Sequence, residues 1–279
     1  MRRFVFALSL ITLCPLAGLH AQVFAPNEAG VAMGHWHTTV KDVEASKKFW
    51  VLLGGTPAKV GGTEAIKFPG VLIYLTKGEP SGGTIGTVVD HLGLKVTNGK
   101  EYMTKLQAAG VKMDEHAGFQ RPGGTGWGYV FSPDDLRVEI LDNVEALKKN
   151  DLAVPPAADH VHYLVPESAG PEIQAWYAQR FGGKPIQENN TNRTLAAEFP
   201  GSVKLRIGKT SGSLLPTKGR TLDHIAFEVK NLEALCRKLE ASGVKFDQPY
   251  RKSSNPAEAN ARFTDPWGVS VELTGGHGE

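Results

Sequence analysis

Six histidines and two glutamates of this chain recur in short segments whose composition is typical of β-strands. The separation in sequence between His91 and Glu139 is the same as that between His224 and Glu272. Two imidazoles and one carboxylate form a facial ligand set, which leaves coordination positions of a divalent metal open to a substrate. Such a metal acts as a Lewis acid or, if it is iron, activates dioxygen. The other histidines of the pattern are His35, His37, His160 and His162.

The alternation of side chains along a strand directs these polar residues to one face. In the segment 223–229, Ile225, Phe227 and Val229 point to one side, whereas His224 points to the other with Ala226 and Glu228. The same alternation holds for the other histidine segments and for both glutamate segments. A histidine or glutamate on the polar face of a strand is usually solvated, and regular spacing also follows from common ancestry. The pattern alone therefore indicates homology more firmly than it indicates a bound metal.

An internal repeat accounts for the spacing. The segments VVDHLGLKV, KLQAAGVKM and SPDDLRVEIL return later in the chain as TLDHIAFEV, KLEASGVKF and DPWGVSVELT, all at one constant offset. An unbroken register across all three segments predicts two homologous domains, 30–143 and 158–275. The segment between them, 144–157, carries charges and then Pro155 and Pro156, which is typical of a linker.

Each predicted domain contains two halves, in which a strand with histidine precedes an amphipathic helix and several short strands. Asp42 stands where an N-cap would begin the first helix. The apolar residues of the last helix follow helical spacing: Leu232, Leu235, Cys236 and Leu239. Cys236 is therefore interpreted as a small buried hydrophobe. The order of elements predicts an α+β fold with helices on one face of a largely antiparallel sheet.

The overall charge excludes some classes of function, and its small excess has one location. The chain has 31 Lys+Arg and 29 Asp+Glu, a balance that argues against binding nucleic acid or anionic membranes. Arg2 and Arg3 precede the apolar stretch FVFALSLITLCPLAGL, and small residues follow near Ala21. This order is typical of a secretory signal peptide, here 1–21. We therefore expect a secreted or periplasmic protein that has no membrane span once the signal is removed.

The segments MGHWHTTVKDVEASKKFWVLLGG, VDHLGLKV, SPDDLRVEIL, ADHVHYLV, LDHIAFEV and FTDPWGVSVEL together resemble the vicinal oxygen chelate superfamily. This superfamily includes glyoxalases, bleomycin-resistance proteins, fosfomycin-modifying enzymes and extradiol dioxygenases. The resemblance implies two tandem domains, each a pair of βαβββ modules that form a cup-shaped mixed sheet. It also implies a small-molecule substrate and a divalent metal such as Fe, Mn, Zn, Ni or Co.

The resemblance further implies which residues hold the metal in each domain. By position, the ligands are His35, His91 and Glu139 in the first domain, and His160, His224 and Glu272 in the second. His37 and His162 lie two residues after a ligand on the same face, so they suit contacts with a substrate or with the ligands.

In the glyoxalases that this chain resembles, a second carboxylate usually joins the metal ligands. It comes from the last strand of the first module of a pair. Here the corresponding stretch GVLIYLTKG offers Tyr74, and GSVKLRIGK offers Leu205 or Arg206. A glyoxalase-type proton shuttle through a metal-bound glutamate is thus in doubt in both domains.

Extradiol dioxygenases normally add a histidine and a tyrosine close to the metal. In this chain Tyr129 lies ten residues before Glu139, with His116 nearby, whereas Arg262 occupies the equivalent position before Glu272. The candidate catalytic residues are accordingly Glu139, Glu272 and Tyr129. Two functions remain: a metal-dependent lyase, isomerase or ring-cleaving dioxygenase, or a protein of the bleomycin-resistance kind that sequesters a ligand without catalysis.

Overall fold

The computed structural model describes residues 24–114, 126–149, 151, 153–190, 192–254 and 258–275. The predicted signal peptide and His116 lie outside these residues. Among the residues described, no helix is long and apolar enough to cross a membrane.

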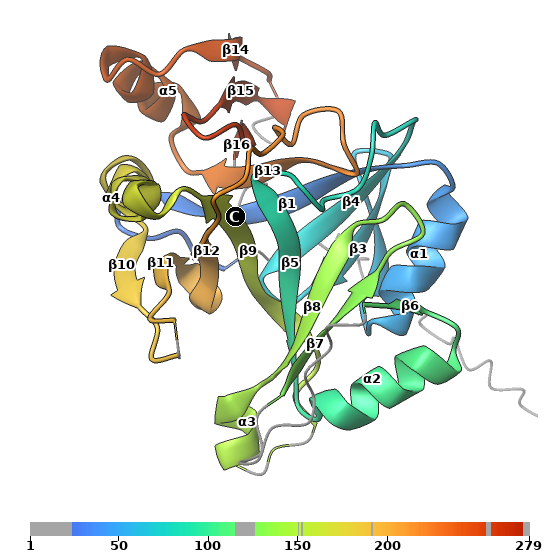
Figure 1. Ribbon diagram of the computed structural model, residues 1–279. Coiled ribbons are helices and arrows are strands. Elements are labelled where there is room, and N and C mark those ends of the chain that lie inside the picture. The colour runs from blue at the N-terminus through green and yellow to red at the C-terminus, as the bar shows by residue number, and fades with distance from the viewer. Residues whose placement is uncertain are drawn as a thin grey trace, which may run out of the picture.

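Four modules with the order strand, helix, three strands follow one another along the chain (Figure 1). Module 1 contains β1 (Val31–Val40), α1 (Val43–Leu52), β2 (Thr56–Val60), β3 (Thr63–Phe68) and β4 (Val71–Lys77). Module 2 contains β5 (Val89–Val96), α2 (Gly99–Ala108), β6 (Lys112–Met113), β7 (Trp127–Phe131) and β8 (Arg137–Asp142). The short helix α3 (Val144–Lys148) then occupies part of the predicted linker.

The second half of the chain repeats this order. Module 3 contains β9 (Ala157–Val165), η1 (Glu167–Ala169), α4 (Gly170–Phe181), β10 (Lys184–Gln187), β11 (Leu195–Phe199), η2 (Pro200–Ser202) and β12 (Val203–Lys209). Module 4 contains β13 (Leu222–Val229), α5 (Leu232–Ala241), β14 (Phe246–Arg251), β15 (Asn260–Thr264) and β16 (Ser270–Gly275).

The modules form two mixed sheets of eight strands. One sheet has the order β14-β15-β16-β13-β1-β4-β3-β2, and the other has the order β10-β11-β12-β9-β5-β8-β7-β6. The predicted α+β fold with paired βαβββ modules is confirmed. The partners differ from the expectation, however, because module 1 pairs with module 4 and module 2 pairs with module 3. Neither 30–143 nor 158–275 completes a sheet by itself.

The connections between modules explain this exchange of partners. The β4–β5 connection leads from the first sheet to the second, and the β12–β13 connection leads back. The two connections bond to each other: Val88 N–H donates to Leu215 O at 3.0 Å, and Thr221 N–H donates to Gly82 O at 3.0 Å. A sequence repeat reports common ancestry but not which strand edges pair, so it gives no information on this arrangement.

The helices pack on the side of the sheets away from the histidines, as the alternation predicts. The Asp42 carboxylate accepts the Ala45 N–H at 3.0 Å and caps α1. The inner face of α5 is apolar and buried, as predicted, and consists of Leu232, Leu235, Cys236 and Leu239. Both sheets and their helices share one hydrophobic core, in which Phe181 of α4 stacks on Phe227 of β13 with 5.0 Å between the ring centroids.

Candidate metal centres

Strand pairing brings the predicted ligands into two clusters. We call His91, Glu139 and His160 the inner site, because modules 2 and 3 supply it. We call His35, His224 and Glu272 the outer site, because modules 1 and 4 supply it. The predicted grouping is therefore wrong in one respect: His35 and His160 exchange places. The cause is the pairing of β5 with β9 and of β1 with β13.

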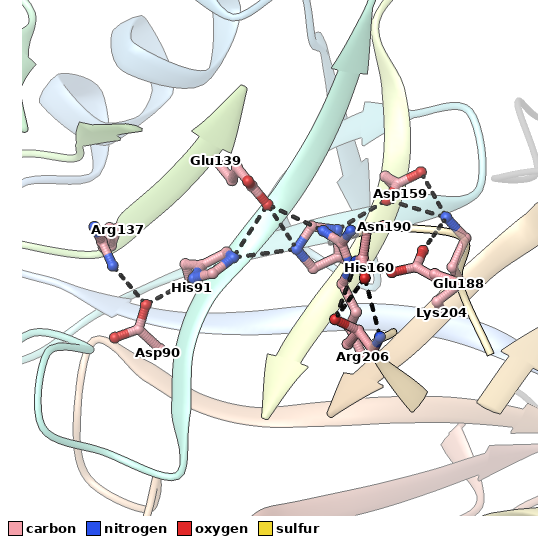
Figure 2. Close-up of polar contacts among 11 residues, drawn as sticks. Asp90, His91, Arg137, Glu139, Asp159, His160, Glu188, Asn190, Lys204 and Arg206 are labelled. Atoms are coloured by element: carbon pink, nitrogen blue, oxygen red, sulfur yellow. Dashed lines mark hydrogen bonds and ion pairs between the residues drawn. The ribbon is translucent and has the colours of Figure 1, made fainter. Parts of the chain in front are cut away.

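The inner site is a convergence of three donor atoms (Figure 2). Nε2 of His91 lies 3.2 Å from Oε2 of Glu139, and Nε2 of His160 lies 3.1 Å from the same oxygen. The two Nε2 atoms are 3.2 Å apart. His91 and His160 expose 2% and 0% of their surface, and Glu139 exposes 6%. These side chains are therefore not merely solvated on a polar face.

Two carboxylates fix the orientation of the inner imidazoles. Nδ1 of His91 lies 2.7 Å from Oδ2 of Asp90, and Nδ1 of His160 lies 2.8 Å from Oδ2 of Asp159. An ionised carboxylate only accepts hydrogen bonds, so each Nδ1 carries the proton and donates it. In a neutral ring, Nε2 then presents a lone pair toward the centre of the site.

Cations keep these carboxylates ionised. Arg137 Nη1 lies 2.7 Å from Oδ2 of Asp90, and Lys204 Nζ lies 3.2 Å from Oδ1 of Asp159. Burial opposes the charge of Asp90, yet His91 and Arg137 together lower the pKa of this carboxyl below its ordinary value. The pKa of Asp159 is lowered in the same way, because His160 and Lys204 outweigh its burial.

The donor set of the inner site fits a divalent metal. Two lone pairs and a carboxylate oxygen face one another at 3.1–3.2 Å, an arrangement that needs a cation at its centre. Donors bound at about 2.1 Å and separated by roughly 90–100° around a metal lie about 3.0–3.2 Å apart. Without a metal a proton takes this role: burial opposes charging His91, but hydrogen bonds to Asp90 and Glu139 raise its pKa.

Further polar and aromatic side chains surround the inner site. The rings of His162 and His91 stack with centroids 4.3 Å apart, and Nδ1 of His162 is buried without a partner among the described residues. The Tyr129 ring lies 5.0 Å from the His91 ring and carries the Arg137 guanidinium at 3.6 Å. Arg206 Nη1 approaches Oε2 of Glu139 at 3.4 Å.

The outer site has the same frame with different neighbours. Oε2 of Glu272 lies 3.2 Å from Nε2 of His35 and 3.2 Å from Nε2 of His224. Nδ1 of His224 lies 2.6 Å from Oδ1 of Asp223. Arg262 Nη2 reaches the cluster at 3.3 Å from both His224 Nε2 and Glu272 Oε1.

Aromatic contacts enclose the outer imidazoles. His35 stacks on Tyr74 with centroids 4.1 Å apart, and His37 stacks on His224 with centroids 4.3 Å apart. Burial, with Glu272 opposing it, lowers the pKa of His35. Burial and the nearby His224 and His35 lower the pKa of His37 to about 3, so this ring is neutral near pH 7.

Residues 32–273 match the protein family described as the Glyoxalase/Bleomycin resistance protein/Dioxygenase superfamily. The chain belongs to this superfamily. Glyoxalase I from Zea mays has a similar fold, with 16% identity, a TM-score of 0.66, and coverage of 88% of this chain and 92% of that chain. A proposed dioxygenase from Bacillus subtilis subsp. subtilis aligns with 15% identity and a TM-score of 0.63, over 92% of this chain and 86% of that chain. No curated protein sequence matches the chain.

Members of this superfamily usually bind a divalent metal, and the two histidine clusters offer places for it. His91, His160 and His162 bring one nitrogen each within 4.8 Å of one another, and an equivalent outer cluster exists. The position at which glyoxalases usually have a second carboxylate lies on β4 for the outer site and on β12 for the inner site. There, Tyr74 lies opposite His37 and Arg206 lies opposite His162, whereas Leu205 is buried away from the site.

Sequence reasoning missed the carboxylates beside the histidines. Neighbouring residues in a regular strand point to opposite faces, so strand alternation alone would direct Asp90 and Asp159 away from the ligands. Each of them occupies the extra position of a β-bulge in the β5–β9 pairing, which turns it toward the site. The signal was present as an Asp-His pair in three of the four modules, the third being Asp223-His224.

Proposed function

We propose that the protein is an exported, metal-dependent enzyme whose inner site chelates a small oxygen-rich substrate. The convergence of His91, His160 and Glu139 at 3.1–3.2 Å carries this proposal. These residues would hold a divalent metal on one face and leave the opposite positions open. When bound, the metal supplies Lewis acidity toward the substrate oxygens or, as iron, the capacity to activate dioxygen.

The surrounding residues define what the chain itself contributes. Burial and the charge of Glu139 raise the pKa of Tyr129, so its phenol keeps the proton and donates a hydrogen bond to a substrate oxygen. Burial and the nearby His91 and His160 hold the pKa of His162 well below its ordinary value, so this ring stays neutral and accepts a hydrogen bond from a substrate hydroxyl. Hydrogen-bond reach between such groups and the reacting atoms is the first requirement of acid–base catalysis.

Among the reactions of the superfamily, ring cleavage with dioxygen agrees best with these side chains. A glyoxalase-type isomerisation uses a second carboxylate, and the structure has Tyr74 and Arg206 at those positions. The inner site instead combines two histidines and one glutamate with Tyr129 and His162, which flank His91. A diol on an aromatic ring offers the two adjacent oxygens that such a site would chelate.

Export is supported by the sequence alone. The basic pair Arg2 and Arg3 before an apolar stretch, with small residues near Ala21, is the basis for a secreted or periplasmic location. Expression of the full chain and mass spectrometry of the mature protein test this: we expect loss of about the first 21 residues, and an uncleaved protein retained in the cytoplasm would contradict it.

The enzymatic proposal is tested by metal analysis and oxygen uptake on residues 22–279. We expect stoichiometric divalent metal in the wild type and its loss from the inner site in Glu139→Gln. With iron bound, the wild type should consume oxygen in the presence of catechols, and Glu139→Gln should not. Glu198→Gln, on β11, is the matched control and should behave as the wild type.

Two other outcomes would redirect the proposal. Turnover of a hemithioacetal without oxygen uptake would indicate a glyoxalase-type isomerase instead of a dioxygenase. Tight binding of a ligand without metal and without turnover would indicate a sequestering protein of the bleomycin-resistance kind.

A further inference from the structure

We propose that the two sites bind divalent metal with unequal affinity, the inner site at least tenfold more tightly, because Arg262 competes for the donors of the outer site. The inference rests on the proposed metal function and concerns which cluster of this chain carries it. The two clusters are built from equivalent positions, so each difference between them can be compared directly.

The first difference lies in the β-bulges that precede the histidines. Asp90, Asp159 and Asp223 each occupy the extra position of a bulge, and the carboxylate of each one bonds Nδ1 of the histidine that follows. The fourth bulge, before His35, has Gly34 at this position. His35 therefore has no carboxylate on the preceding residue. Glu228 of β13 approaches this place instead, since a Cβ at Gly34 would lie 3.2 Å from its Cγ.

The second difference is the residue opposite the glutamate on the neighbouring strand. Tyr129 pairs with Glu139 in the inner site, and Arg262 pairs with Glu272 in the outer site. The Arg262 guanidinium donates from Nη2 toward His224 Nε2 and Glu272 Oε1, at 3.3 Å in each case. The Nε2 lone pair of His224 is one that a metal would need, and Oε1 is the second oxygen of the carboxylate whose Oε2 faces both histidines. A metal entering the outer site must displace an internal cation.

Arg206 does not play this part in the inner site. Its Nη1 lies 3.4 Å from Glu139 Oε2, but its Nε donates to Oε2 of Glu188 at 2.6 Å, which holds the guanidinium to one side (Figure 2). Among the described residues, the Nε2 atoms of His91 and His160 have only each other and Glu139 as polar partners. Arg206 thus contacts the carboxylate but neither imidazole, and the Nε2 lone pairs of His91 and His160 remain available to an external cation.

The third difference is the residue that lies opposite His160 in the inner site and opposite His35 in the outer site. His160 lies opposite Gly93, and a Cβ at Gly93 would overlap the His160 ring. In the outer site, His35 lies opposite Ala226, so its ring has to accommodate a methyl group. The rings of the two ligand histidines lie closer together in the inner site, with centroids 5.2 Å apart for His91 and His160 and 5.7 Å apart for His35 and His224.

Calorimetric titration of chelator-treated protein with Zn²⁺ tests the inference. We expect two classes of site separated by at least tenfold in Kd. Glu139→Gln should remove the tight class and Glu272→Gln the weak class. Replacing Arg262 with the residue of the inner site, in Arg262→Tyr, should tighten the weak class by tenfold or more. Absorption of bound Co²⁺ gives an independent readout of the filling order.

The outcomes separate this inference from the proposed function. Equal affinities, loss of the tight class in Glu272→Gln, or an unchanged weak class in Arg262→Tyr would overturn the inference and leave the metal function in place. Absence of binding to both sites of the wild type would overturn both. Circular dichroism of each variant checks folding, and Arg262→Tyr decides the question even where a glutamate variant fails to fold.

Discussion

Asp159 and His160 are neighbours in one β-strand, yet Oδ2 of Asp159 lies 2.8 Å from Nδ1 of His160. In a regular strand these two side chains would point to opposite faces. The bulge in the β5–β9 pairing removes this conflict, because Asp159 has no partner in the register. A local irregularity of the backbone thus supplies the carboxylate that orients a candidate metal ligand.

Substitution of Asp159 tests this role. In Asp159→Ala, His160 loses its orienting acceptor, and Lys204 loses one of its two carboxylates. We expect the affinity of the inner site for Zn²⁺ to fall about 10–100-fold. Competition with a chromophoric chelator measures this change. The matched variant Asp223→Ala should leave the tight class of binding unchanged, and a similar loss of that class in both variants would contradict the assignment.

A glycine beneath His160 gives a steric test of the same site. A Cβ at residue 93 overlaps the His160 ring, so Gly93→Ala should displace this imidazole and weaken Zn²⁺ binding by at least about tenfold. Overpacking of this kind also costs about 1–3 kcal/mol in the free energy of unfolding. Thermal and urea denaturation measure the second effect. Gly212→Ala serves as control, since the nearest atom to a Cβ there is 3.7 Å away; unchanged metal binding in Gly93→Ala would refute the steric argument.

Much of the fold, but only part of the site, could be predicted from the sequence. Alternation around His224 and helical spacing around Cys236 identified the faces correctly, because these patterns depend on local geometry. The exchange of His35 and His160 between sites could not be predicted, since it depends on which strand edges meet. The contact of Arg262 with His224 and Glu272 depends on the same long-range pairing.

Metal binding should depend on pH through His91. Burial opposes its charge, but hydrogen bonds to Asp90 and Glu139 raise its pKa above the ordinary 6.5. A metal needs the neutral ring, so binding releases a proton and the affinity of the inner site falls as pH is lowered through this pKa. Zn²⁺ titrations in two buffers of different ionisation enthalpy measure the released proton. Binding that is independent of pH between 6 and 8 would argue against this site.

The stability of the metal-free protein should show the opposite trend. Because the folded pKa of His91 is raised, its protonation stabilises the fold fully below about pH 6.5, and this contribution is lost as pH rises through the folded pKa. The difference in free energy of unfolding between the wild type and His91→Asn should therefore shrink with rising pH. Urea denaturation of chelator-treated samples measures this difference. A difference that grows with rising pH would contradict a raised pKa of His91 in the folded protein.

A buried hydrogen-bond network joins β9 and α4 to the turn before β16. The hydroxyls of Tyr163 and Tyr177 lie 2.8 Å apart, and Tyr177 donates to Oδ2 of Asp265 at 2.7 Å. Oδ1 of Asp265 accepts the backbone N–H groups of Trp267 and Val269 at 3.0 and 2.8 Å. Module 3 is thereby joined to module 4 through one carboxyl group.

Burial raises the pKa of Asp265 to about 6, although Tyr177 and the backbone donors oppose this shift. The folded state then holds a proton that the unfolded state loses near its ordinary 3.8, so stability falls as pH rises between these values. Asp265→Asn keeps an acceptor for the backbone donors and has no charge to bury. Between pH 4 and pH 6.5 we expect the free energy of unfolding of the wild type to fall by on the order of 3 kcal/mol. The free energy of unfolding of Asp265→Asn should not show this fall. Urea denaturation of both proteins across this window measures the difference, with Asp247→Asn as an exposed control. Parallel stability profiles of wild type and Asp265→Asn would mean that Asp265 is ionised in the folded protein throughout.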